Sequence, residues 1–235
     1  MLRLIAFDAD DTLWHTEDMF QDTQKRLGDI LEQYAPREKV DAALGKTEKQ
    51  NIKLFGYGIK GFTLSMVETA IDLSDGRIEA QQIHEIVMMG KKMLDAPMRL
   101  FIGVEDVLRT LKQRYLLAII TKGDLLDQTN KVYKSGLADL FDYVEVVSEK
   151  DVATYSALFQ EWSIDPASVM MIGNSVPSDI VPVLELGGHA VHIPYEMTAV
   201  HEIHHKDPTH QNFTRLTDIC EIPDLIDQME LRELI

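Results

Sequence analysis

The sequence predicts an α/β fold: a parallel sheet covered by helices on both faces, with an all-helical insertion after the first strand. Three observations support this prediction. Short apolar runs recur along the chain, amphipathic segments of helical length lie between them, and residues 16–96 contain no convincing strand. Because strands that alternate with helices indicate a parallel sheet, we expect a sheet domain of residues 1–15 and 97–235 and a helical domain of residues 16–96.

The strands are predicted from short runs that are rich in strand-forming residues. Residues 2–7 read LRLIAF and end abruptly in carboxylates, which is typical of a buried parallel strand. Together with that first run, four later runs of four to six residues supply the predicted sheet, at 116–121, 143–147, 169–172 and 190–193.

The helices are predicted from apolar residues that recur with the helical period. Four such segments separate the strands, at 104–113, 125–135, 153–162 and 178–186. Three more segments make up the helical insertion, at 19–34, 62–73 and 78–94. A last helix is predicted over residues 223–235, because Pro223 stands at its start, where proline is tolerated.

The chain's composition excludes several classes of protein. Its 235 residues include 23 Lys and Arg against 39 Asp and Glu, which gives a formal net charge of −16. Nucleic acids and anionic membranes attract basic surfaces, so neither is an expected partner. The single cysteine, Cys220, excludes an intrachain disulfide and a cysteine-rich zinc module. There is no signal-peptide core and no apolar run of the roughly 20 residues that span a membrane, which predicts a soluble, cytoplasmic protein.

Carboxylates crowd the end of the first predicted strand. Asp8, Asp10 and Asp11 lie there in the string DADDT. Bringing like charges together costs free energy unless a cation or a proton offsets it. A lone aspartate at this place would be interpreted as a helix cap. Three of them favour a ligand site, because ligands of open parallel sheets bind at the carboxyl ends of the strands.

The other strand ends supply groups that suit a phosphate. Thr121 closes one strand and is followed by Lys122, Lys150 follows another strand, and residues 173–179, GNSVPSD, follow a third. Taken alone, Thr121 would be a strand cap and Lys150 a surface lysine. Because both residues are expected at the same edge of the sheet as the carboxylates, they indicate one site that includes all of these groups.

These motifs, in this order, resemble those of the haloacid dehalogenase superfamily of phosphotransferases and phosphohydrolases. The first family motif, Asp-x-Asp-x-Thr after an apolar strand, stands here as DADDT and begins at Asp8. Thr121 matches the second motif, a Ser or Thr that closes a strand, and Lys150 matches the third, a Lys ahead of a helix. Residues 173–179 match the fourth, which usually reads Gly-Asp with a second Asp a few residues on.

The resemblance covers about residues 1–15 and 98–195, and it implies both a fold and a reaction. The implied fold is a Rossmann-like, doubly wound parallel sheet with a helical cap inserted after the first motif. The implied reaction is Mg²⁺-dependent hydrolysis of a small phosphorylated metabolite through an aspartyl-phosphate. Asp8 would be the nucleophile and Asp10 the general acid and base, whereas Asp11 has no assigned role.

The same resemblance implies which groups would hold the substrate and the metal. The phosphoryl oxygens would be bound by Thr121, Lys150 and the backbone amide of Lys122. The ligands of Mg²⁺ would be the Asp8 carboxylate, the Asp10 carbonyl, Asn174 and Asp179.

Asn174 departs from the family pattern, because most members have Asp at that position. An amide oxygen can still ligate Mg²⁺, but the site has one negative charge fewer. We therefore expect weaker metal binding with activity retained. Replacing Asn174 with Asp should tighten Mg²⁺ binding, and an unchanged metal titration would count against this assignment.

Three other functions stay open. A phosphoacceptor signalling module also gathers acids, a threonine and a lysine at strand ends, and a catalytically inactive phosphate-binding relative would keep the same groups. A 2-haloacid dehalogenase uses the first aspartate of the motif as its nucleophile, but it lacks the second and needs no metal. The presence of Asp10 therefore favours phosphoester chemistry, in which a leaving oxygen must be protonated.

Two short motifs match sites that their surroundings do not support. Residues 56–61, GYGIKG, fit the dinucleotide pattern G-x-G-x-x-G, but they follow a polar stretch of the helical insertion instead of a strand, which predicts a loop between helices. Residues 201–205, HEIHH, fit the zinc motif H-E-x-x-H. A solvated polar loop is the favoured interpretation there, because the string lies beyond the last predicted strand.

Overall fold

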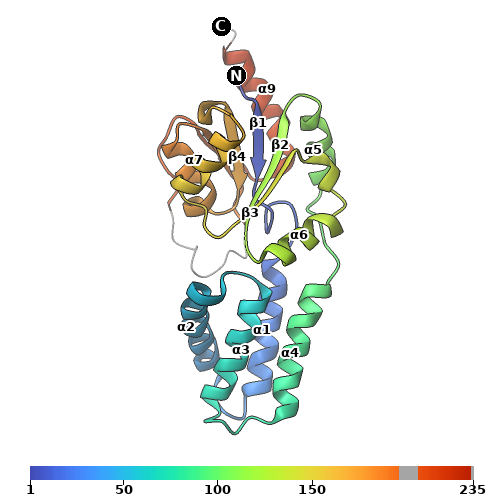
Figure 1. Ribbon diagram of the computed structural model, residues 1–235, viewed down its shortest axis with the longest axis vertical. Coiled ribbons are helices and arrows are strands. Elements are labelled where there is room, and N and C mark those ends of the chain that lie inside the picture. Colours follow the sequence, from blue (N-terminus) through green and yellow to red (C-terminus); the bar gives the residue numbers. More distant parts are fainter. Residues whose placement is uncertain (196–205, 234–235) are drawn as a thin grey trace. The chain divides into compact units, whose positions relative to one another are not determined.

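The computed structural model describes residues 1–195 and 206–233 (Figure 1). Two compact units make up the chain. The sheet unit comprises Met1–Glu17, Met98–Lys122 and Lys131–Ile235, and the helical unit comprises Asp18–Pro97 and Gly123–Asn130. The string HEIHH at 201–205 lies outside the described residues.

Within the described residues, the sheet unit contains a six-stranded sheet in the order β3-β2-β1-β4-β5-β6. Every neighbouring pair of strands is parallel, which confirms the predicted α/β fold. The strands are β1 (Leu4–Phe7), β2 (Leu116–Lys122), β3 (Tyr143–Val147), β4 (Val169–Gly173), β5 (His189–His192) and β6 (Phe213–Arg215). The sequence does not predict β6, because three residues are too few to show a pattern.

Four α-helices of the described chain lie wholly in the sheet unit: α5 (Val104–Lys112), α7 (Val152–Glu161), α8 (Val181–Glu185) and α9 (Ile222–Glu233). The helix α6 (Leu125–Lys134) is shared between the two units. The boundary between the two units falls inside α6. The helix predicted over residues 178–186 is divided in the structure. A π-helical turn at Val176–Ile180 precedes α8, and each of the two segments has a proline in its first positions, where the missing amide donor does not interrupt a helix.

Alternate residues of β1 enter two hydrophobic cores, one on each face of the sheet. Ile5 and Phe7 belong to the cluster that contains the buried side of α5. Leu4 and Ala6 belong to the cluster that contains the buried side of α7. Because side chains alternate along a strand, β1 is covered on both faces, and Figure 1 shows α5 and α7 on opposite sides of it.

The helical unit has a hydrophobic core of its own. Its helices are α1 (Glu17–Leu31), α2 (Arg37–Phe55), α3 (Ile59–Leu73) and α4 (Ala80–Asp95). Leu27, Leu44, Met66 and Ile86, from the four helices in turn, are buried in this core. In the described parts of the chain, no helix is both long and apolar enough to cross a membrane.

Helix α2 and the glycines after it correct one part of the sequence prediction. The sequence does not predict α2, because Val40 and Leu44 are its only buried apolar residues. Gly56 ends α2 with a φ of 75°, and Gly58 precedes α3 with a φ of 111°, conformations that glycine adopts at little cost. Residues 56–58 of the G-x-G-x-x-G string therefore form a turn between two helices, residues 59–61 begin α3, and the element before the string is the helix α2 and not a strand.

Candidate active site

The carboxyl ends of β1 and β4 meet where the winding of the chain reverses. From β1 the sheet extends to β2 and β3 on one side, and β4 then lies on the other side of β1. Asp8 follows β1 directly, and its amide donates to the carbonyl of Ile172 in β4 at 2.8 Å. Asn174 follows β4. Ligands of open α/β sheets bind at such a switch point, so this edge is the candidate active site.

Lys150 joins two of the predicted site residues by direct ion pairs. Its Nζ lies 2.5 Å from Asp8 Oδ1 and 2.7 Å from Asp179 Oδ1. Lys150 is 4% exposed and Asp179 is 0% exposed, so salt screens these charges little. Burial acts to lower the pKa of Lys150, but the charges of Asp179 and Asp8 outweigh it and hold that pKa above its ordinary value. The ammonium therefore stays charged between the two carboxylates.

Local hydrogen bonds fix the segments that carry these groups. Asp151, the residue after Lys150, caps the start of α7. Asp179 lies in the π-helical turn, and its Oδ2 accepts from the amide of Ser175 at 3.0 Å. The Tyr155 hydroxyl on α7 donates to a backbone carbonyl of the same turn at 3.1 Å. Helix α7 thus holds both the lysine and the turn that carries its partner.

Asp8 lies at the centre of the cluster. Burial and the charge of Asp179 raise the pKa of Asp8 to about 7, although Lys150 opposes them. The Thr12 hydroxyl lies 3.3 Å from Asp8 Oδ2 and 3.4 Å from Asn174 Oδ1. The structure therefore brings Asp8, Lys150, Asn174 and Asp179 together, and we call these four residues the carboxylate–lysine cluster.

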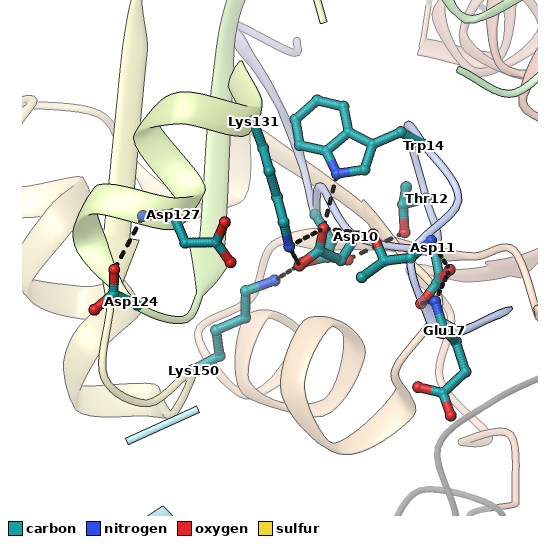
Figure 2. Close-up of polar contacts among 11 residues, drawn as sticks. Asp10, Asp11, Thr12, Trp14, Glu17, Asp124, Asp127, Lys131 and Lys150 are labelled. Carbon is teal, nitrogen blue, oxygen red and sulfur yellow. Dashed lines mark hydrogen bonds and ion pairs between the residues drawn. The ribbon is translucent and has the colours of Figure 1, made fainter. Parts of the chain in front are cut away.

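Asp10 is held by three donors that the sequence analysis does not anticipate (Figure 2). Its Oδ1 accepts from Trp14 Nε1 at 2.7 Å, from Thr16 Oγ1 at 2.8 Å and from Lys131 Nζ at 3.0 Å. Its Oδ2 lies 2.9 Å from the same ammonium. Burial acts to raise the pKa of Asp10, but Lys131 and the hydrogen bonds from Thr16 and Trp14 outweigh it and lower that pKa. Asp10 is therefore an ionised carboxylate in this structure.

One sequence signal could have identified Lys131. It lies on α6 beside Gln128 and Val132, on the buried side of that helix, and it is 7% exposed. Lysine is almost never buried unless its charge is paired. A lysine on the inward face of a predicted amphipathic helix thus indicates a carboxylate partner. Trp14 and Thr16 carry no comparable signal.

Asp11 lies next to the site and stabilises the start of α1. Its backbone has a φ of 61°, and its Oδ1 accepts from the amide of Thr16 at 2.8 Å and from the amide of Glu17 at 3.0 Å. Burial raises the pKa of Asp11 to about 7, although the hydrogen bonds from Glu17 and Thr16 oppose it. Asp11 therefore caps α1 and holds Thr16, whose hydroxyl reaches Asp10.

Thr121 and Lys122 end β2, the strand that flanks β1 on the side away from β4. Thr121 is buried. The Lys122 side chain donates from Nζ to Ser178 Oγ at 2.9 Å, which ties the end of β2 to the turn that carries Asp179. The role of these two residues toward phosphoryl oxygens stays a prediction.

The donor set at this edge suits a hard cation. The described residues contain no group of three or more His, Cys, Asp or Glu side chains that could hold a metal. The cluster offers two carboxylates, from Asp8 and Asp179, and the amide oxygen of Asn174. Mg²⁺ usually takes one or two carboxylates and keeps several waters, whereas zinc is bound chiefly by His and Cys. The residues present therefore fit Mg²⁺ and do not fit zinc.

Known proteins share this sequence pattern. The model of one family, haloacid dehalogenase-like hydrolase, matches residues 2–183. A glyceraldehyde 3-phosphate phosphatase from Methanothermobacter thermautotrophicus is 24% identical over 238 residues, which cover 96% of this chain and 100% of the relative.

Solved structures share the fold. A haloacid dehalogenase-like family hydrolase from Xanthomonas campestris is 37% identical with a TM-score of 0.88, over 98% of this chain and 93% of that one. A 2-haloacid dehalogenase from Pseudomonas syringae is 17% identical with a TM-score of 0.65, over 97% of this chain and 100% of that one. The likeness to the second structure concerns the fold alone.

Proposed function

Because this chain belongs to the haloacid dehalogenase-like hydrolase family, we propose that it is a Mg²⁺-dependent phosphatase that hydrolyses a small phosphorylated metabolite. The observation that carries the proposal is the position of Lys150 Nζ, 2.5 Å from Asp8 and 2.7 Å from Asp179. A buried ammonium beside the nucleophile offsets the repulsion between a carboxylate and an incoming phosphate dianion. The same ammonium can hold the phosphoryl oxygens as their charge is redistributed.

The proposed reaction proceeds in two halves through Asp8 and Asp10. An Asp8 oxygen bonds to phosphorus while the ester oxygen leaves, and Asp10 gives that oxygen a proton. Asp10 then takes a proton from the water that attacks the aspartyl-phosphate, which frees Asp8 and releases inorganic phosphate. Since Asp10 is ionised in the structure, it must gain a proton before the first half. An approaching anionic phosphoryl group favours that step, because a nearby negative charge raises the pKa of a carboxyl group.

Four groups of the chain would hold Mg²⁺ in this proposal: Asp8, Asp179, Asn174 and the carbonyl of Asp10. When bound, the ion would offset the negative charge of Asp8 and of the phosphoryl oxygens. The hydroxyl of Ser175, the residue after Asn174, supports the fit. It is buried and makes no hydrogen bond within the described structure, so a water of a hydrated ion could satisfy it.

The curated relative supports a small phosphate monoester as the substrate class. That relative is named a glyceraldehyde 3-phosphate phosphatase and matches 96% of this chain at 24% identity. We therefore propose triose phosphates as the first compounds to test, within a wider set of phosphorylated sugars and small acids.

Release of inorganic phosphate, with and without Mg²⁺, tests the proposal. We expect p-nitrophenyl phosphate and glyceraldehyde 3-phosphate to be hydrolysed only with Mg²⁺. The Asp8→Asn variant should lose about 10³-fold or more in kcat, because it removes the nucleophile. Asp139→Asn changes an exposed aspartate on the 3₁₀ turn Ala138–Leu140 and serves as the matched control.

Three other results would contradict this function. Release of halide from a 2-haloacid without Mg²⁺, and no release of phosphate, would support a dehalogenase. A stable aspartyl-phosphate without hydrolysis of any ester would support a phosphoacceptor module. Stabilisation by phosphorylated ligands without any turnover would support an inactive binding protein.

A further inference from the structure

His192 is a buried polar residue beside the candidate site that the proposed reaction does not use. It ends β5, and it is 7% exposed. In the sheet it lies opposite Gly173 of β4 on one side and opposite Arg215 of β6 on the other. The neighbour of Gly173 along the chain is Asn174, the residue that departs from the family pattern.

The imidazole of His192 connects Asn174 to two charged residues. Its Nε2 lies 3.1 Å from the backbone oxygen of Asn174, and its Nδ1 lies 3.0 Å from Asp207 Oδ1. Arg215 donates to Asp207 Oδ2 at 2.6 Å. A carbonyl oxygen can only accept, so Nε2 must carry a proton there. The four residues form one chain of hydrogen bonds from Arg215 to Asn174.

Asp207 supports this arrangement from the far side of the imidazole. Burial acts to raise the pKa of Asp207, but the hydrogen bonds from Arg215 and His192 outweigh it and lower that pKa. Asp207 is therefore a carboxylate, and its Oδ1 lies 3.0 Å from Nδ1 of the imidazole. An imidazole with a polar partner at each nitrogen is fixed in one orientation. Residues behind a metal ligand usually act in this way, because they fix the orientation of the ligand.

Orientation has a particular value when a metal ligand is an amide. A carboxylate presents an oxygen in both of its flipped orientations, whereas an amide presents oxygen in one and a hydrogen-bond donor in the other. Asn174 Oδ1 lies 3.4 Å from the Thr12 hydroxyl, and its backbone oxygen is held by His192. The residue is thus contacted both at its side chain and at its peptide.

We propose that His192, held by Asp207 and Arg215, is a positioning residue that fixes the Asn174 peptide so that the amide oxygen of Asn174 faces the Mg²⁺ ion. This inference rests on the proposed function, because it takes Asn174 as a ligand of Mg²⁺. It assigns His192 no contact with substrate. The chain of hydrogen bonds compensates for a ligand that has no charge of its own.

Two substitutions of His192 separate its hydrogen bond to Asn174 from its bulk. In His192→Gln, the side-chain amide nitrogen can reach the position of Nε2 and donate to the Asn174 oxygen. In His192→Asn, the side chain is shorter and reaches only the position of Nδ1. We expect His192→Asn to weaken Mg²⁺ binding about tenfold and His192→Gln to restore most of the affinity. His189→Asn, at the other end of β5, is the matched control and should bind Mg²⁺ as the unaltered protein does.

Mg²⁺ titration of the intact, substrate-free protein, followed by tryptophan fluorescence, gives the affinities. A second readout is turnover of p-nitrophenyl phosphate over a range of Mg²⁺ concentrations. The loss in His192→Asn should fall on the Mg²⁺ concentration at half-maximal rate much more than on kcat at saturating Mg²⁺. In an Asn174→Asp background the same loss should shrink, because a carboxylate does not depend on its orientation in this way.

The outcomes distinguish this inference from the proposed function. If the unaltered protein hydrolyses no phosphate monoester, the proposed function fails. If it hydrolyses them with Mg²⁺ but His192→Asn binds Mg²⁺ normally, or His192→Gln binds as poorly as His192→Asn, the positioning role is overturned while the function stands. Should His192→Asn not fold, Asp207→Asn decides: a weaker hold on the imidazole predicts weaker Mg²⁺ binding, and unchanged binding contradicts the inference.

Discussion

At the scale of single residues, the behaviour of Asp10 depends on Lys131. That lysine brings a positive charge to the Asp10 carboxylate, whereas Trp14 and Thr16 donate neutral hydrogen bonds to it. Replacing it with Met keeps the length of the side chain and removes the charge. We expect Lys131→Met to lose up to about 10²-fold in kcat on an alkyl phosphate, because Asp10 loses the ammonium that holds both of its oxygens in place and general acid catalysis contributes about that much or more. Glycerol phosphate is a convenient alkyl substrate for the measurement.

A comparison of leaving groups shows whether Lys131 acts through the general acid. p-Nitrophenolate leaves without a proton, so the first half-reaction of p-nitrophenyl phosphate should be affected much less than that of glycerol phosphate. Lys134→Met, one turn along in α6, is the control. Equal losses on both substrates would mean that Lys131 merely supports the fold.

The sequence predicts the carboxylate–lysine cluster because each member directly follows a strand or lies in the segment after it. Parallel strands place their carboxyl ends at one edge, so Asp8 and Lys150 can be expected near each other without knowledge of the loops. The partners of Asp10 could not be expected in this way. Lys131 comes from the middle of a helix, and its contact with Asp10 depends on how that helix packs.

At the scale of the element, the last residue of β4 is a glycine for a steric reason. A Cβ atom on Gly173 would lie 2.2 Å from Asp179 Oδ2 and 2.6 Å from Asp179 Cβ. Asp179 cannot retreat without losing its ion pair with Lys150. We expect Gly173→Ala to lower the free energy of unfolding by about 1–3 kcal/mol and to abolish Mg²⁺-dependent turnover.

Gly45, in the helical unit, has room for a side chain, in contrast to Gly173. It lies in the interior of α2, and a Cβ atom there would meet nothing within 4 Å. Gly45→Ala should therefore raise the free energy of unfolding by roughly 0.5–1 kcal/mol. Urea unfolding monitored by circular dichroism measures both variants. A Gly173→Ala protein as stable as the unaltered one would contradict the close approach of Asp179.

Glu48 on α2 links the stability of that helix to pH. Burial raises the pKa of Glu48 above its ordinary value of 4.5, so between these two pKa values the folded state binds more protons than the unfolded state. Stability contributed by this group therefore falls as pH rises through that window. Glu48→Gln should be more stable than the unaltered protein at neutral pH, and the gain should vanish below about pH 4.

The control for Glu48 is an acid on the same helix with the opposite expected sign. Glu38 lies in the first turn of α2, where a negative charge interacts favourably with the helix dipole. Glu38→Gln should lower stability slightly at neutral pH. Unfolding midpoints of both variants across pH 3 to 8 measure the difference. A gain for Glu48→Gln that persists at pH 3 would exclude the titration of Glu48 as its cause.

Elements differ in how much of them the sequence predicts. β1, β2 and β4 are buried on both faces, and a strand in that position must be almost continuously apolar. Helix α2 lacks a clear apolar stripe because one of its three buried residues is Asn51, which donates to Ser65 on α3 and is hidden from any apolar pattern.

At the scale of the whole molecule, the two units have separate hydrophobic cores. Leu27 is fully buried in the core of the helical unit, and Leu117 is fully buried in the sheet unit. Leu27→Ala should cost about 2–5 kcal/mol, and we expect faster hydrogen exchange in the helical unit with unchanged protection of β1. Leu117→Ala should give the reverse pattern. If Leu27→Ala accelerates exchange in β1 by the same factor, the units unfold as one.

The sequence predicts only part of the division of the chain into two units. The sequence predicts a helical segment between the first strand and the remaining sheet because strand patterns are absent there. It does not predict that Gly123–Asn130 groups with the helical unit. Within that group, Lys60 forms an ion pair with Asp124 at 2.8 Å. The two residues are 64 positions apart and exposed, so no apolar periodicity in the sequence indicates that they are in contact.

The strand order also affects how the protein is made. Leu4 in β1 pairs with Leu116 in β2 and with Val169 in β4, so the ribosome must synthesise α1, α2, α3 and α4 before either neighbouring strand exists. Domains generally fold as their residues emerge. Those helices can bury their own core before β1, an apolar strand, has either of its partner strands. Nascent chains that stop before residue 116 should therefore bind chaperones through their amino-terminal segment and release them once β2 has been translated.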